Sequence, residues 1–230
     1  MSANSAKQGI PFVVAAPSGT GKTTVCRQVT ERDGRISFSV SHTTRRRRDA
    51  EVEGRDYFFV DEPEFRSLVA KGEFLEWAEY NAHLYGTSWK AIDRGLAGGR
   101  DLLLEIEVQG ARQVRERRPD ARLIFLLPPS MEELERRLQG RGTDSEEEIR
   151  RRLKVANREL KAVGGFDYGV ANDDVECCVE NLLEIIRSER EGLVSELRER
   201  FSPAAAAEKF RGSRAAPGSR GKPGESEGHR

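Results

Sequence analysis

Cysteine is scarce in this chain, and its few cysteines follow no structural pattern. Cys26 stands alone, and Cys177 and Cys178 are adjacent. This spacing fits neither a zinc site nor a disulfide framework, and it is typical of proteins in a reducing compartment. The chain also has no apolar run of about 18 residues and no apolar signal core at its N-terminus. We therefore expect a soluble, cytoplasmic protein with no membrane partner.

Net charge is lacking too. Lys and Arg total 39 residues, and Asp and Glu also total 39. A protein without net charge produces no overall field that attracts nucleic acid, so we expect no specific nucleic-acid partner. The histidines are scattered, which argues against a histidine-based metal site. Nothing in the composition distinguishes a monomer from a homo-oligomer.

Composition changes near residue 200 and indicates the domain organisation. Residues 10–200 have the length of one domain, after a flexible N-terminus at 1–9. Beyond residue 200 the chain is rich in Ala, Gly, Pro, Ser and Arg, and Phe210 is its last large apolar residue. Such a segment buries too little apolar surface to offset the entropy of ordering. We therefore predict a disordered basic tail at 201–230.

A glycine-rich turn follows the apolar run at 12–14 and ends in Gly-Lys-Thr. A strand, such a turn and then a helix form a phosphate-binding loop. Gly19 and Gly21 let successive N–H groups point into one anion-sized hollow, and the following helix adds its positive N-terminal end. The predicted ATP-binding residues of this loop are Ala16, Pro17, Ser18, Gly19, Thr20, Gly21, Lys22, Thr23 and Thr24.

The end of this loop carries the groups that act on a nucleotide. Lys22 supplies an ammonium for the β- and γ-phosphates, and the Thr23 hydroxyl can ligate Mg²⁺. The loop departs from the usual pattern at its first position, where Ala16 replaces glycine. We expect a negative φ at Ala16, because it stands where the strand passes into the loop. The loop indicates a nucleoside triphosphate site.

Buried strands alternate with amphipathic helices along the rest of the chain. The predicted strands are 12–15, 36–40, 57–60, 102–108, 122–127 and 175–179, and helices are predicted to start after Asp61, Ser130 and Ser145 and at about residue 180. Some of these strands are apolar on both faces, as strands covered by helices on both sides must be. The pattern predicts an α/β fold with a mostly parallel central sheet flanked by helices.

The segment at about 36–92 breaks this alternation and carries an unusual group of polar residues. A run of four arginines at 45–48 lies between hydroxyl-bearing residues and a tyrosine. Guanidinium forks match phosphate oxygens in a bidentate way, so this basic loop suits a monophosphate. The candidate residues of this second site are Ser41, Arg45, Arg48, Tyr57, Glu76, Tyr85 and Thr87.

Glu76 is the residue that we predict to recognise a purine base. Guanine has two adjacent donors on its pairing edge, and one carboxylate accepts both of them. Adenine has an acceptor in place of the ring donor, and it would leave the carboxylate unpaired. The hydroxyls of Ser41 and Thr87 can donate to the guanine carbonyl oxygen. The sequence therefore predicts a guanine nucleotide as the second ligand.

Taken in order, these motifs closely resemble guanylate kinase over about residues 10–200. The matching segments are 41–45, Arg48, 53–57, 76–78, 85–87, 105–111, 140–143 and 172–174. The resemblance implies a P-loop kinase fold with a mixed β insert at about 36–92 that binds GMP and a helical lid at about 130–161. It also implies transfer of the γ-phosphoryl group of ATP to GMP, and to dGMP, with Mg²⁺.

The resemblance also distributes roles among the residues by matching position. The second-site group above binds GMP, together with Glu107, where the family generally has aspartate and the role therefore stays open. Mg²⁺ is held by Thr23, with Glu105 acting through water. Arg137 and Asn172 contact ATP, Asn172 on the adenine side. The catalytic residues implied are Lys22, Arg45, Arg141 and Arg152.

Two other functions stay open at this point. Scaffold proteins contain guanylate-kinase-like domains that bind peptides in the nucleotide cleft, and these have no need of Gly19, Gly21 or Lys22. A related kinase with another acceptor, such as a phosphorylated ribose, has no need of the base-reading carboxylate of Glu76. An acceptor assay would separate these hypotheses.

Overall fold

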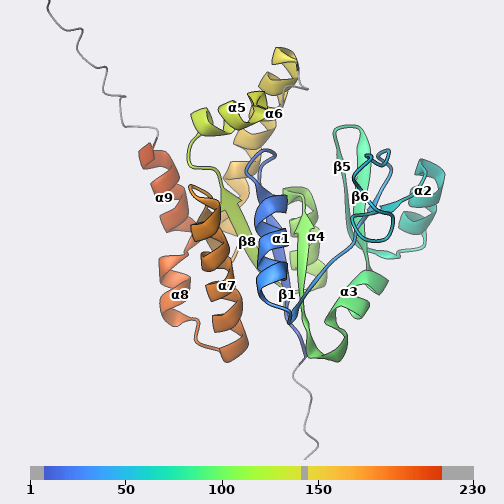
Figure 1. The fold of residues 1–230 in the computed structure, drawn as a ribbon, viewed down its shortest axis with the longest axis horizontal. Coiled ribbons are helices and arrows are strands. Elements are labelled where there is room, and N and C mark those ends of the chain that lie inside the picture. Colours follow the sequence, from blue (N-terminus) through green and yellow to red (C-terminus); the bar gives the residue numbers. More distant parts are fainter. Residues whose placement is uncertain (1–7, 141–144, 214–230) are drawn as a thin grey trace, which may run out of the picture.

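The structure is a computed structural model that describes residues 8–140 and 145–213 (Figure 1). The predicted catalytic residue Arg141 lies outside the described residues, as does most of the predicted connection at 140–143. The predicted N-terminal segment and tail fall there in part, at 1–7 and 214–230. No helix of the described part is both long and apolar enough to cross a bilayer.

A parallel sheet forms the centre of the molecule, as the sequence predicts. Its strands are β1 (Pro11–Ala15), β2 (Ile36–Phe38), β7 (Asp101–Ile106), β8 (Arg122–Leu127) and β9 (Tyr168–Ala171), in the order β2-β7-β1-β8-β9. Every neighbouring pair in this sheet is parallel. The carboxyl ends of the strands therefore meet at one edge, where α/β proteins bind ligands.

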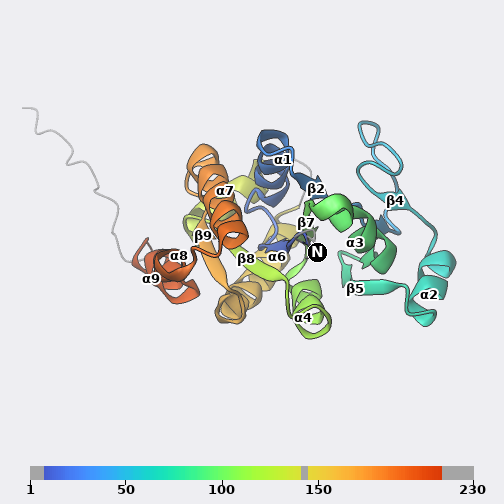
Figure 2. The ribbon, with the colours of Figure 1, turned by 90° about the horizontal axis from the view of Figure 1, so that it is seen from below.

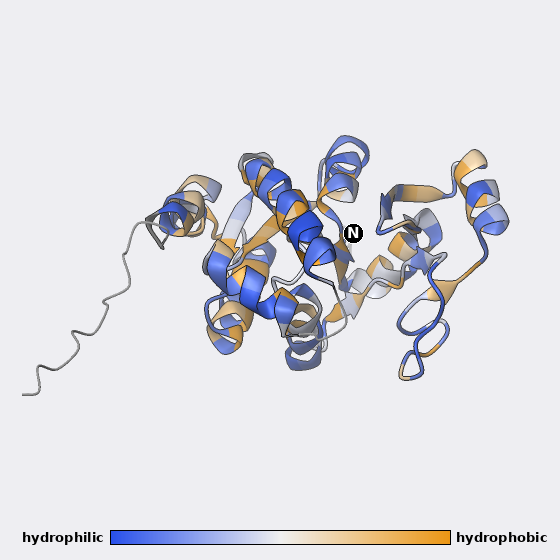
Figure 3. Ribbon diagram, turned by 90° about the horizontal axis from the view of Figure 1, so that it is seen from above, coloured by the Kyte–Doolittle hydropathy of each residue, from blue (hydrophilic) through white to orange (hydrophobic). Residues whose placement is uncertain are grey.

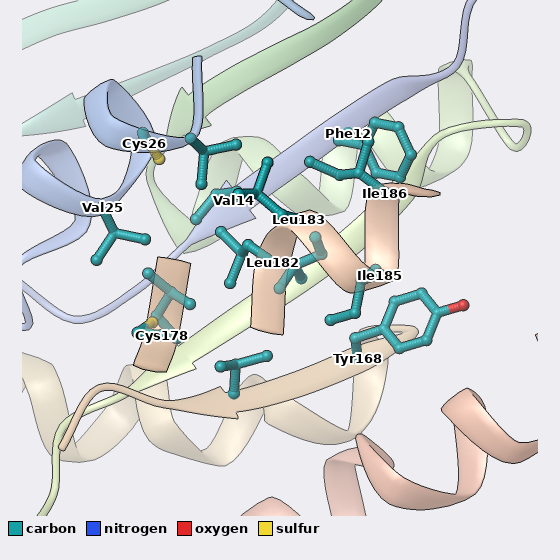
Figure 4. Close-up of a cluster of buried hydrophobic side chains, with 14 of the residues drawn as sticks. Phe12, Val14, Val25, Cys26, Tyr168, Cys178, Leu182, Leu183, Ile185 and Ile186 are labelled. Carbon is teal, nitrogen blue, oxygen red and sulfur yellow. The ribbon is translucent and has the colours of Figure 1, made fainter. Parts of the chain in front are cut away.

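Helices cover both faces of this sheet (Figure 2). Because side chains alternate along β1, Phe12 and Val14 pack with α1 (Lys22–Arg32) and α7 (Val175–Glu191) on one face (Figure 4). Val13 packs on the other face with α3 (Trp89–Leu96) and α4 (Val108–Arg117). Figure 3 shows the same division, with hydrophobic strands inside and hydrophilic outer sides on the helices. This double cover explains why the central residues of these strands are apolar on both faces.

A second, mixed sheet forms the inserted subdomain at the side of the core (Figure 1). Its strands are β3 (His42–Thr43), β4 (Phe58–Phe59), β5 (Phe74–Tyr80) and β6 (His83–Ser88), in the order β4-β3-β6-β5. The helix α2 (Glu62–Ala70) packs on it through Phe65, which contacts Phe74 and Leu84. Asp61 caps α2 as predicted, since its carboxylate accepts from the Glu64 N–H at 2.8 Å.

Two helices stand above the carboxyl edge of the core sheet, α5 (Met131–Gln139) and α6 (Glu146–Glu159). Both predicted N-caps are confirmed: Ser130 accepts from the Glu133 N–H at 3.1 Å, and Ser145 from the Glu148 N–H at 3.3 Å. The helices pack on each other through Leu134, Leu138, Ile149 and Ala156. Two short 3₁₀ turns complete the connections, η1 (Ala97–Gly99) and η2 (Leu160–Gly165).

The strand predicted at 175–179 is wrong. These residues form the first turns of α7, because the Asp174 carboxylate caps that helix by accepting from the Cys177 N–H at 2.9 Å. The last strand is instead β9, which the sequence analysis missed. The helix predicted over 180–200 is divided at Gly192, whose φ of 76° ends α7, and α8 (Ser195–Arg200) follows. A short apolar run alone does not distinguish a strand from a buried helix turn.

The disorder predicted from residue 201 does not hold for the described residues up to 213. They include the helix α9 (Pro203–Ser213), which packs Ala206 and Phe210 against the core. The Phe201 carbonyl accepts from the Gly169 N–H at 2.8 Å, so this segment also pairs with the edge strand β9. The alanines at 204–207, whose abundance contributed to the prediction of disorder, are strong helix formers.

Candidate active site

A cleft of about 630 Å³ lies at the carboxyl ends of β1 and β7, between the core and the inserted sheet. It brings together most of the predicted site residues. From the core and lid these are Ala16, Pro17, Ser18, Gly19, Thr20, Gly21, Lys22, Thr23, Thr24, Glu105, Glu107 and Arg152, and from the insert Ser41, Arg45, Arg48, Tyr57, Glu76 and Tyr85. Thr87 lies behind Glu76, while Arg137 and Asn172 contact the loop from outside the cleft.

The phosphate-binding loop has the backbone geometry that its glycines predict. Gly19 and Gly21 have φ of 90° and 95°, values that residues with a Cβ rarely adopt. Within the described residues, positive φ outside glycine occurs at Asn81 and Ala82, so the negative φ predicted for Ala16 is confirmed. Gly21 also caps α1, which places the positive end of that helix at the loop.

Lys22 projects from the start of α1 toward the ends of β7. Its ammonium donates to the Ile106 carbonyl at 2.7 Å and lies 3.5 Å from the Glu107 carboxylate. Burial would lower the pKa of Lys22, but the charges of Glu107 and Glu105 more than offset this and raise it. The lysine therefore stays protonated as a fixed positive charge in the cleft.

Thr23 and Glu105 form the part of the cleft that suits a magnesium ion. The Thr23 hydroxyl donates to a Glu105 carboxylate oxygen at 2.5 Å. Among the described residues no group of three or more His, Cys, Asp or Glu side chains could hold a metal. A hydroxyl and one carboxylate fit Mg²⁺, which keeps several of its waters and relies on substrate phosphates for other ligands.

The lid and the loop after β9 hold the phosphate-binding loop from two sides. Arg152 of α6 donates to the Ser18 hydroxyl at 2.6 Å. The Thr20 carbonyl accepts from Asn172 at 2.6 Å and from Arg137 at 3.2 Å, and Arg137 also donates to the Asn172 carbonyl. The predicted ATP residues Arg137 and Asn172 thus support the loop from the side away from the insert.

Glu76 is buried at the opposite end of the cleft, with only 3% of its surface exposed. Thr87 donates to one of its carboxylate oxygens at 2.6 Å, and the Ser41 and Thr87 hydroxyls are 3.0 Å apart. Burial raises the pKa of Glu76 to about 7. A Cβ on Gly110 of α4 would lie 2.2 Å from the other carboxylate oxygen. Gly110 therefore makes room for this acid, a role that the sequence did not reveal.

The arginine run folds into a basic corner beside two tyrosines. The rings of Tyr57 and Tyr85 are 6.1 Å apart, and the Arg45 guanidinium carbon lies 5.6 Å from the Tyr57 ring centre. Burial, followed by the Glu105 carboxylate, raises the pKa of Tyr57 to about 12, so its hydroxyl stays protonated. Arg48 lines the same corner. The corner is suited to a phosphate group.

Three charged residues of the cleft were missed from the sequence, Glu51, Arg27 and Glu148. Glu51 pairs with Arg45 at 2.7 Å, and Arg27 of α1 pairs with Asp56 of the insert at 2.7 Å. An acid three residues after the last arginine of a run is the signal that could have indicated Glu51. Arg27 carries no comparable local signal, because its contact with the insert depends on how α1 and the insert face each other.

Comparisons with known proteins agree with this geometry. A model of the guanylate kinase family matches residues 8–189. The chain is 53% identical over 177 residues to the guanylate kinase of Dechloromonas aromatica (strain RCB), covering 77% of this chain and 88% of that protein. It is 50% identical over 182 residues to that of Aromatoleum aromaticum, with 79% and 89% covered. The crystal structure of guanylate kinase from Anaplasma phagocytophilum aligns with a TM-score of 0.66 and 35% identity, over 80% of this chain and 87% of that one.

Proposed function

The chain belongs to the guanylate kinase family, and we propose that it transfers the γ-phosphoryl group of ATP to GMP with the two nucleotides end to end in the cleft. The products are ADP and GDP, and the reaction is a step of purine nucleotide metabolism that recycles GMP. None of the assigned residues binds the ribose 2′-hydroxyl, so we expect dGMP to act as an acceptor as well. Because both substrates are cytoplasmic nucleotides, we place the reaction in the cytoplasm.

ATP is assigned to the core side of the cleft. The N–H groups of the phosphate-binding loop and the end of α1 hold its β- and γ-phosphates. Lys22, fixed by the Ile106 carbonyl, adds a point charge beside them. Arg152 reaches this loop from the lid, so its guanidinium is assigned to the group in transfer. Arg137 and Asn172 stabilise the loop, and Asn172 is also assigned to contact the adenine base.

Mg²⁺, which guanylate kinases generally need, is assigned to Thr23, with Glu105 acting through water. The hydrogen bond of 2.5 Å between these side chains supports the assignment, because it places two hard oxygen ligands together. When bound, the ion supplies charge neutralisation at the phosphates. The Glu107 carboxylate lies 3.5 Å from the Lys22 ammonium and helps to keep it charged by raising the pKa of the lysine.

GMP is assigned to the insert. The basic corner of Arg45, Arg48, Tyr57 and Tyr85 takes its phosphate, and Glu76 accepts the two donors of the guanine pairing edge. One oxygen of Glu76 also accepts from Thr87 and the other lies next to Gly110, and each keeps a lone pair for one donor of the base. The Ser41 hydroxyl, 3.0 Å from that of Thr87, is assigned to the guanine carbonyl, whereas Thr87 uses its one hydrogen on Glu76 and acts through that carboxylate.

The chemistry that remains is alignment and charge stabilisation. Phosphoryl transfer asks little covalent chemistry of a protein, since the acceptor phosphate oxygen attacks the γ-phosphorus directly. Two polyanions must approach each other, and Lys22, Arg45 and Arg152 offset their repulsion from three sides of the cleft. Closure of the lid over the cleft would exclude water and so prevent hydrolysis of ATP.

The observation that carries this proposal is a buried carboxylate, Glu76, in the same cleft as a complete phosphate-binding loop. A coupled assay of ADP formation with GMP, dGMP, AMP, CMP and UMP tests it. We expect turnover that depends on Mg²⁺ and prefers GMP and dGMP by at least about 100-fold, as expected for a site that pairs with a base edge. Equal use of all acceptors, or tight phosphopeptide binding without turnover, would contradict the proposal.

A further inference from the structure

Glu51 lies in the basic corner that we assign to the GMP phosphate, where a negative charge is unexpected. Its side chain is 16% exposed and faces an Arg45 side chain that is 15% exposed. An acid at this place could oppose the binding of a phosphate, or it could prepare the arginine for it. The contacts of the carboxylate decide between these roles.

Both carboxylate oxygens of Glu51 are engaged. One accepts from Arg45 Nη2 at 2.7 Å, and the other accepts from Arg45 Nη1 at 3.1 Å and from the Arg48 backbone N–H at 2.8 Å. The Glu51 N–H in turn donates to the Arg48 carbonyl at 3.0 Å. The acid therefore closes the turn that contains both phosphate-site arginines, and its departure would leave the Arg48 N–H and the Arg45 guanidinium without these partners.

The contacts of Glu51 also determine which side of Arg45 faces the ligand. A guanidinium has five N–H donors in one plane. Arg45 Nη1 uses its two hydrogens on Glu51 and the Arg46 carbonyl, the latter at 2.8 Å, and Nη2 uses one on Glu51. The Nε–H and the second Nη2–H remain, and these two point the same way and match two phosphate oxygens. The Tyr85 hydroxyl also interacts with this guanidinium.

We propose that Glu51 is a positioning residue for the acceptor phosphate: it holds Arg45 so that the Nε and Nη2 edge of the guanidinium faces the phosphate of GMP. The rings of Tyr57 and Phe59, at 5.6 and 5.9 Å from the guanidinium carbon, restrict the remaining rotation. Burial would raise the pKa of Glu51, but hydrogen bonds from Arg45 and the Arg48 backbone lower it, so the carboxylate stays ionised at neutral pH. This inference rests on the proposed function, because it concerns the same acceptor site.

The test is the kinetics of Glu51→Gln with ATP and GMP. A carboxamide keeps the shape but loses the charge and one acceptor, so Arg45 is free to turn. We expect KM for GMP to rise about 10- to 50-fold, the size expected for losing a hydrogen bond between charged groups. We expect kcat and KM for ATP to change less than about threefold, because Glu51 contacts neither the phosphate-binding loop nor the lid in the described structure. Glu51→Asp should recover part of the affinity.

Two further variants make the test specific. Asp49→Asn in the same loop is the matched control, since Asp49 makes no ion pair or side-chain hydrogen bond within the described residues, and it should leave KM for GMP unchanged. In an Arg45→Lys background the guanidinium fork is gone, so adding Glu51→Gln should change KM for GMP less than about threefold.

Each other outcome overturns the inference. A lower KM for GMP in Glu51→Gln would show that the acid competes with the phosphate. An unchanged KM would show that Arg45 is held without it. Equal losses for ATP and GMP, with a lower melting temperature, would indicate a purely structural role. The proposed function fails separately, if the wild-type protein does not phosphorylate GMP at all.

Discussion

Replacing Glu76 with glutamine tests the central feature of the proposed acceptor site, a buried acid that we assign to both donors of guanine. Glutamine keeps only one acceptor oxygen, so it cannot accept both guanine donors, and it places an N–H₂ group against one of them. The change also removes a charge from a site that is 3% exposed. We therefore expect loss of guanine recognition while the surrounding packing is retained.

The expected loss of kcat/KM for GMP follows from the hydrogen bonds that the substitution removes. A hydrogen bond to a charged group contributes about 1.5–3 kcal/mol, and the loss leaves a buried donor unpaired. Each 1.4 kcal/mol is about a factor of ten, so kcat/KM for GMP should fall roughly 100-fold or more. KM for ATP should stay within about twofold, because Glu76 is at the end of the cleft away from the phosphate-binding loop.

The assay is coupled ADP formation at pH 8, above the pKa of about 7 that burial gives Glu76, so that the wild-type carboxylate is ionised. Glu79→Gln is the matched control, because Glu79 is on the same strand but exposed, and it should behave as wild type. The variant should also resist urea at pH 8 at least as well as wild type. Burial penalises the ionised carboxylate there, and glutamine removes this penalty.

Two kinetic results would refute the assignment of Glu76 to the guanine base. If Glu76→Gln keeps GMP turnover within threefold of wild type while remaining folded, the carboxylate does not read the base. Equal losses in Glu76→Gln and Glu79→Gln would mean that the charge of the strand matters and not the burial of one acid. A gain of AMP turnover would support the assignment, because a carboxamide can donate to the adenine ring nitrogen.

Three other results are expected. KM for GMP should fall as pH rises from 6 to 8 in the wild type, because Glu76, with a pKa of about 7, must ionise to accept both donors. An equally steep pH profile in Glu76→Gln would contradict this, because titration of the GMP phosphate would then be the sole cause. Gly110→Ala should lower kcat/KM for GMP at least about tenfold with KM for ATP unchanged, since its Cβ would lie 2.2 Å from the Glu76 carboxylate; wild-type kinetics would contradict this. Phe210→Ala should lower the free energy of unfolding in urea by about 3 kcal/mol, whereas the exposed Leu193→Ala control should not; equal stabilities would mean that α9 does not pack on the core.

The local features of this chain could be read from the sequence because their causes lie within a few residues. The phosphate-binding loop needs Gly19 and Gly21 for positive φ, and both have it. The caps at Asp61, Ser130 and Ser145 each depend on one side chain and an N–H three residues later. The family motifs added the roles of the distant residues, which spacing alone does not provide.

Errors arose where distant contacts compete with local preference. The run at 175–179 suits a strand, but α7 buries Cys178 and Val179 against β1 and β9 together with the rest of its apolar face. The segment after residue 200 has a composition typical of disorder, yet the edge of β9 offers it an N–H at Gly169 and an apolar surface for Phe210. In both places, burial against distant parts of the chain decides the secondary structure, and the local sequence alone does not indicate that burial.

The sequence by itself determined the phosphate-binding loop, the helix starts at Asp61, Ser130 and Ser145, the parallel core and the residue types of the two proposed nucleotide sites, because each follows from short-range geometry or a recognisable motif. Only the tertiary structure decided how those residues behave. The pKa of Glu76 is raised because the fold buries its carboxylate, an effect that the hydrogen bond from Thr87 offsets only in part, and Gly110 leaves space for the side chain. Arg45 has a defined orientation because Glu51 closes the turn around it. Charge and orientation depend on burial and on partners, which the folded chain supplies.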